Sequence, residues 1–77
     1  MNTSRIQVSY RDGSKPKGVK VVLGFAGLLG GMSKAAYTDQ YGVALVSHSG
    51  TGQADVYVSG KKLGSFHAPG ETVVFTS

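Results

Sequence analysis

The stretch Y-T-D-Q-Y-G-V-A-L-V, residues 37–46, places turn-forming residues between two β-prone runs. Asp39 is of the type that hydrogen-bonds its own turn, and Gly42 can supply the positive φ with which the next strand begins. The stretch therefore predicts the corner of a β-sheet. Tyr37 stands just before this corner, and Tyr41 stands within it.

Alternation of apolar and polar residues extends outward from the corner in both directions, which is typical of half-buried strands. Seven short strands are expected, at residues 5–10, 19–25, 34–38, 43–48, 54–59, 63–67 and 72–76. The second is the clearest core strand, because its apolar residues share one face. A short helical turn over residues 28–37 is the alternative, although Gly30 and Gly31 each cost about 1 kcal/mol relative to alanine in a helix.

Length and composition favour one domain over residues 1–77. The chain is 40% hydrophobic and 16% charged, and it has no cysteine, so its core must hold by packing without disulfides. No apolar leader precedes the first strand, so we expect a cytoplasmic protein if Met1 is the native start. The longest apolar stretch, residues 19–32, is interrupted by Lys20 and four glycines, so no membrane span is expected.

Three segments resemble the carboxypeptidase regulatory-like domain. They are P-K-G-V-K-V-V-L at residues 16–23, T-D-Q-Y-G-V-A at residues 38–44 and G-Q-A-D-V-Y-V-S-G-K at residues 52–61. The resemblance implies an all-β fold, a seven-stranded immunoglobulin/transthyretin-like antiparallel sandwich, and it implies hardly any specific activity. The chain departs from the family at the polar Ser47-His48 pair and at the unusually apolar segment 26–32, which suggests a local purpose for that segment.

Few residues could perform catalysis. His48 and His67 have no carboxylate at triad or metal-ligand spacing, and each is interpreted as a solvated residue at a strand end. The glycine-rich runs match neither a phosphate-binding loop nor a dinucleotide fingerprint. We therefore expect a non-catalytic chain with no metal and no cofactor.

The apolar loop is the first candidate for function. Phe25, Leu28, Leu29 and Met32 exceed what so small a core can bury, and surplus apolar residues often mark an interface. Alternatively, Leu28 or Leu29 closes the open end of the sandwich. The leading hypothesis is protein-protein association or self-association through this loop and a strand edge, by β-augmentation or as a homo-oligomer.

A carbohydrate- or polyanion-binding module is the second candidate. The net charge is +4, with basic residues around the first turn and at Lys61 and Lys62. Tyr37, Tyr41 and Tyr57 could stack on sugars or on the bases of a nucleic acid. A solvated face that keeps a small β protein unpaired is the simpler interpretation of the lysines.

Overall fold

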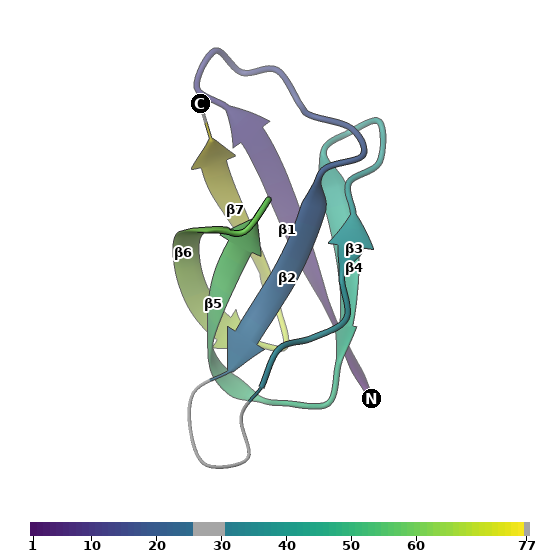
Figure 1. Cartoon of the computed structure of the whole chain (residues 1–77), viewed down its shortest axis with the longest axis vertical. Coiled ribbons are helices and arrows are strands. Elements are labelled where there is room, and N and C mark those ends of the chain that lie inside the picture. Colours follow the sequence, from purple (N-terminus) through teal and green to yellow (C-terminus); the bar gives the residue numbers. More distant parts are fainter. Residues whose placement is uncertain (26–30, 77) are drawn as a thin grey trace.

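The computed structural model describes residues 1–25 and 31–76, and in these residues all regular secondary structure is β (Figure 1). The expected strands are all present, with shifted boundaries. They are β1 (Asn2–Tyr10), β2 (Lys20–Phe25), β3 (Ala36–Tyr37), β4 (Val43–His48), β5 (Gly52–Val58), β6 (Lys61–Ala68) and β7 (Glu71–Thr76). The part of the alternative helical turn that is described, residues 31–37, is not helical.

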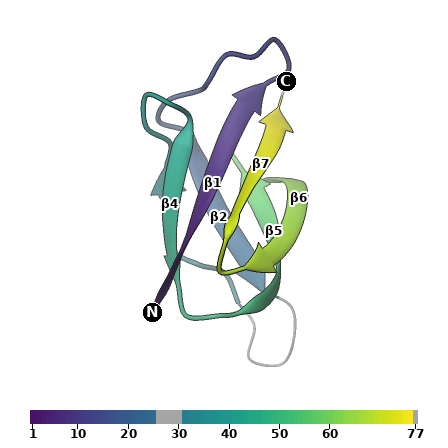
Figure 2. The ribbon, with the colours of Figure 1, turned by 180° about the vertical axis from the view of Figure 1, so that it is seen from behind.

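Two sheets pack face to face and confirm the β-sandwich. One has the order β4-β1-β7 and the other the order β3-β2-β5-β6. Figure 2 looks onto the first sheet, with β1 between β4 and β7. The antiparallel expectation is wrong for one pair, because β1 and β7 run parallel. These two strands come from opposite ends of the sequence, and strand-by-strand patterns do not report such a pairing.

Alternating side chains of both sheets fill the core, as the period-2 patterns predict. Ile6 and Val8 of β1 belong to one buried cluster with Val21 and Leu23 of β2, and all four are fully buried. Val46 of β4 belongs to the same cluster. Phe25, at the end of β2, packs against this cluster while remaining half-buried.

The sheet corner at residues 38–42 ties three segments together. Thr38 exchanges backbone hydrogen bonds with the loop after β1, and its Oγ1 accepts the Val19 N–H at 2.9 Å. Asp39 Oδ1 accepts the N–H groups of Tyr41 at 2.8 Å and Val43 at 3.1 Å. Gly42 has φ of 76° and its carbonyl accepts the Val8 N–H at 2.7 Å. The predictions for Asp39 and Gly42 are confirmed, and the corner also anchors β1 and the entry into β2.

Candidate functional site

A hollow of about 790 Å³ lies at one end of the sandwich, beyond the last residues of β2 and β4. Its described lining includes Phe25, Met32, Lys34 and His48, together with the turn that follows His48. The hollow is therefore lined by both described residues of the predicted apolar loop and by a histidine. Leu28 and Leu29, the other two residues predicted there, lie outside the described residues.

His48 is buried, so the interpretation of this residue as solvated is wrong. Only 4% of its surface is exposed, and both ring nitrogens have partners. Nδ1 lies 2.8 Å from the Gly50 carbonyl oxygen, which can only accept, so the tautomer with its proton on Nδ1 fits this contact. Nε2 then accepts the hydroxyl proton of Ser4, whose Oγ lies 2.7 Å away and accepts the Gly70 N–H at 3.3 Å. This network joins β4, β1 and the β6–β7 turn, and it satisfies the polar atoms of the buried side chain that ends β4.

The Ser4–His48 contact has the donor and acceptor arrangement of a hydrolase nucleophile and its base. A nucleophile must reach a substrate carbonyl, however, and Ser4 has no exposed surface. Ser4 is also absent from the described lining of the adjacent hollow. In this conformation the pair holds the sandwich together and offers no access for a substrate.

Phe25 and Met32 lie on different sides of the four-stranded sheet. The Phe25 ring is 5.1 Å from the His48 ring, at an interplanar angle of 37°, and a Cβ placed on Gly50 would lie 2.9 Å from it. Phe25 thus closes one end of the core. Met32 is 63% exposed and forms an isolated bridge with Gly24.

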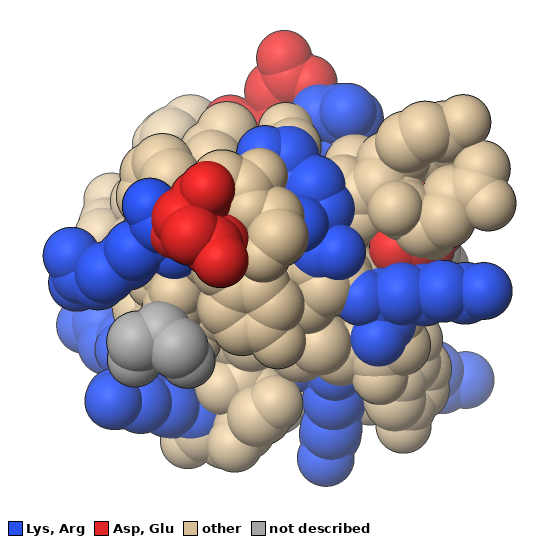
Figure 3. Space-filling model, turned by 90° about the horizontal axis from the view of Figure 1, so that it is seen from above, with Lys and Arg blue, Asp and Glu red and all other residues tan. Residues whose placement is uncertain are grey.

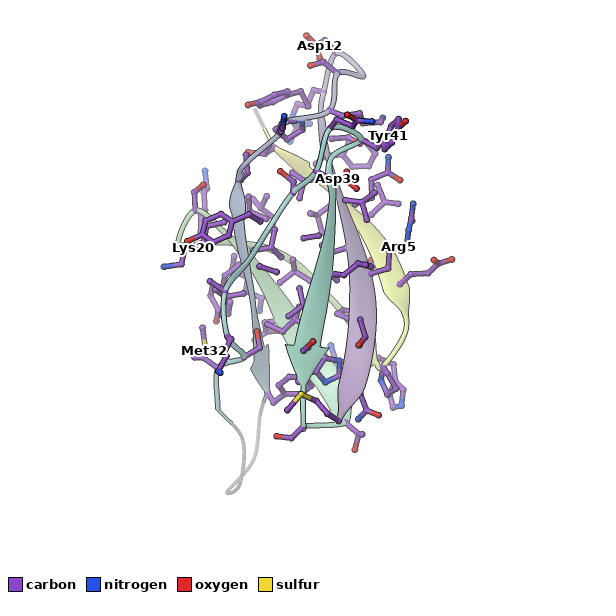
Figure 4. All side chains as sticks on the ribbon, turned by 90° about the vertical axis from the view of Figure 1, so that its right-hand side faces the viewer. Arg5, Asp12, Lys20, Met32, Asp39 and Tyr41 are labelled. Atoms are coloured by element: carbon purple, nitrogen blue, oxygen red, sulfur yellow. The ribbon has the colours of Figure 1, made fainter. Side chains whose placement is uncertain are left out.

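The outer face of the four-stranded sheet brings Met32 together with Tyr57, a pair that the sequence did not connect. A Cβ placed on Gly24 would lie 3.0 Å from the Tyr57 ring and 3.1 Å from the Met32 sulfur, so both side chains cover this glycine. Tyr37 pairs with Lys20 and Tyr57 pairs with Val22, which places both tyrosines on the same face. Lys20 and Met32 both project from this side in Figure 4, whereas Arg5 projects from the opposite face.

The remaining ligand-binding candidates are dispersed. Tyr41 is 65% exposed at the sheet corner, at the same end of the molecule as Asp12 and away from Met32 (Figure 4). Lys62 lies beside Tyr57, with its Nζ 3.4 Å from Asp55 Oδ1, and Lys61 begins β6 at the hairpin. Figure 3, which looks onto the end that carries the loop after β1, shows basic side chains on several sides of the molecule and no single basic stripe.

The outer face of the three-stranded sheet carries exposed apolar residues that were not among the predicted interaction residues. Leu45 is 64% exposed, Val73 is 50% exposed and Phe75 is 57% exposed. Each belongs to a run in which apolar residues are consecutive, A-L-V at 44–46 and V-V-F at 73–75. A strand with one solvent-exposed face should alternate apolar and polar residues. Three consecutive apolar residues break this alternation, and that break is the sequence signal for an exposed apolar side chain.

Within residues 1–25 and 31–76, no group of three or more His, Cys, Asp or Glu side chains converges as a metal site would require. No helix in that part of the chain has the length and apolarity to cross a membrane.

Comparison of the chain with protein-family models, with curated proteins and with solved structures gave no match. The resemblance to the carboxypeptidase regulatory-like domain therefore stays a prediction, while the β-sandwich itself is established by the two packed sheets. Function must be inferred from the surfaces of this chain alone.

Proposed function

We propose that this chain is a non-catalytic module that mediates protein-protein association through an exposed sheet edge and the apolar side chains beside it. The observation that carries the proposal is β7, an edge strand whose outward side chains include Val73 and Phe75. An edge strand with apolar outward side chains is a template for a further strand unless it is blocked. The burial of Ser4 supports the non-catalytic part of the proposal.

One described side chain of the predicted apolar loop is available to a partner. Phe25 is engaged with His48 and the core, so Met32 is the described loop residue that is free to contact a partner. Leu28 and Leu29 stay predicted contact residues. Replacing both leucines with serine, and measuring association by light scattering, separates the loop from the β7 edge.

Site-specific photo-cross-linking tests the proposal. A benzophenone side chain replaces Phe75 in the full chain, which is then irradiated in the cells that naturally produce it. We expect covalent products larger than the chain, whether with a second copy or with another protein. Products should be lost when Val73→Pro removes an edge N–H and retained with Leu45→Pro at the other edge of the sheet. Cross-linking no stronger than from the same probe at Tyr41 would refute the proposal.

A ligand-binding role is the second candidate, favoured by the shared face of Tyr37 and Tyr57. Lys20 and Lys62 lie on the same face, so aromatic and cationic groups are adjacent there. Glycan arrays and oligonucleotide binding across a salt series test this role. We expect Tyr57→Ala to remove any such binding and Tyr41→Ala, at the distant corner, to preserve it. The absence of any binding at low salt would dispose of this candidate.

A further inference from the structure

The open edge of β7 has a defined set of free backbone groups. The Arg5 N–H donates to the Gly70 carbonyl at 2.9 Å, which fixes the phase of the parallel ladder between β1 and β7. In such a ladder, alternate residues bond to one neighbour and the intervening residues face the other side. Glu71, Val73 and Phe75 therefore direct both their N–H and their C=O groups away from β1. None of the described strands pairs with this side of β7.

Each of the other edges of the sandwich carries at least one feature that discourages pairing. β3 is two residues long. β6 begins with two lysines and has a register shift opposite Val56 and Tyr57 that leaves Leu63 as an extra residue. Asp39 occupies the first free position of β4, where its N–H donates to the Val43 carbonyl at 2.9 Å and its carboxylate accepts the Val43 N–H. Short strands, lysines and bulges all discourage edge pairing, and β7 has none of them.

On these grounds we infer that β7 pairs antiparallel with β7 of a second copy of this chain about a two-fold axis at Val73, giving a continuous six-stranded sheet. The inference rests on the proposed function and names its partner. In this register Val73 faces the second copy's Val73, and Glu71 faces the second copy's Phe75. Residues 71, 73 and 75 have both backbone groups free, so every facing pair exchanges two hydrogen bonds.

Charge complementarity argues for a second copy over an unrelated strand. Arg11 follows Tyr10, which pairs with Thr76, so Arg11 lies at the Phe75 end of the edge. It lines a groove of about 520 Å³ together with residues of β6 and β7, among them Leu63, Val73 and Phe75. The antiparallel register carries Glu71 of one copy to this end of the other. Glu71 has a loose, exposed contact with Arg5 at 3.8 Å, which leaves its carboxylate able to turn towards Arg11 of the second copy. The two-fold axis makes this contact twice.

Sedimentation velocity and light scattering on the purified full chain test the inference. One added strand buries less than the roughly 1,200–2,000 Å² of a standard interface, so we expect a dimer that dissociates on dilution, with a dissociation constant below about 1 mM. Val73→Pro should raise this constant at least about tenfold, because it removes an N–H that the ladder to β1 does not use. Leu45→Pro removes an outward N–H from β4 and should leave the dimer intact. Thermal unfolding verifies that both variants fold.

Charge reversal provides a second readout that a folding defect cannot imitate. Glu71→Arg should weaken the dimer roughly two- to thirty-fold, since it removes two exposed ion pairs, and adding Arg11→Glu should restore it. A wild-type chain that stays monomeric up to about 1 mM, a Val73→Pro dimer as strong as the wild type, or no rescue by the double change would overturn the inference. If the chain is monomeric but the Phe75 probe captures a different protein, the proposed function stands and the second copy is excluded.

Discussion

Replacing Ser4 with alanine should destabilise the fold far more than the loss of one hydroxyl group suggests. The Ser4 hydroxyl donates to His48 Nε2 and accepts from the Gly70 N–H, and both Ser4 and His48 are buried. The substitution leaves a buried ring nitrogen without a donor, at a cost of about 1–3 kcal/mol. A domain of this length is stable by only about 4–12 kcal/mol, so a large share would be lost.

Urea and thermal unfolding at neutral pH measure this loss. For a chain of this length each kcal/mol corresponds to about 4–8 °C in Tm, so we expect a decrease of about 5–20 °C. Ser47→Ala is the matched control, because Ser47 precedes His48 on the exposed face, and it should change stability by less than about 0.5 kcal/mol. In a His48→Leu background, Ser4→Ala should cost much less, since no ring nitrogen remains to be orphaned. Equal stability of Ser4→Ala and the wild type would refute the assigned network.

Three further substitutions test the loops. Gly42→Ala should cost about 2 kcal/mol or more, because the new Cβ would lie 2.5 Å from the Val8 carbonyl oxygen and the residue has a positive φ. Gly18→Ala is the control: Gly18 also has a positive φ, 73°, but open space around it, so the change should cost about 1 kcal/mol. Equal losses of stability in urea unfolding would contradict this reasoning. Asp39→Ala should cost about 1 kcal/mol by chemical denaturation and Asp39→Asn less, since the amide oxygen can still accept; a larger loss for Asn would count against the turn bonds. Hydrogen bonds from the Ser14 N–H and hydroxyl lower the pKa of Asp12 below its ordinary 3.8. The stability that these bonds add is therefore fully present above about pH 3.8 and is lost as the pH falls through the lowered pKa. Thermal unfolding from about pH 7 to about pH 2 should show the deficit of Asp12→Ala shrinking in acid, and a deficit independent of pH would disprove the linkage.

Local features of this fold were predictable because local chemistry determines them. The alternation of Val19, Val21, Leu23 and Phe25 predicted a core strand, and the structure places these side chains in or against the core. Gly42 has φ of 76° at the corner where a positive φ was predicted. Asp39 holds its own turn, as short acidic side chains commonly do.

Features that depend on distant parts of the chain were missed. Ser4 and His48 are 44 residues apart, and neither carries a signal of the other in a single sequence. Met32 and Tyr57 cover the same glycine although they lie 25 residues apart in the sequence. Strand order decides which side chains share a face, and periodicity contains no information about strand order.

The parallel pairing of β1 with β7 has a consequence for biosynthesis. Six strands can be made before the last partner of β1 exists, so the edge that β7 covers stays open until residues 71–76 have left the ribosome. At about 5–20 residues per second the emerging chain is exposed in this unfinished state for seconds, and pairings between distant segments are intrinsically slow to form. β7 therefore completes a sheet that β1 begins, and the growing chain presents an unpaired strand edge until it does.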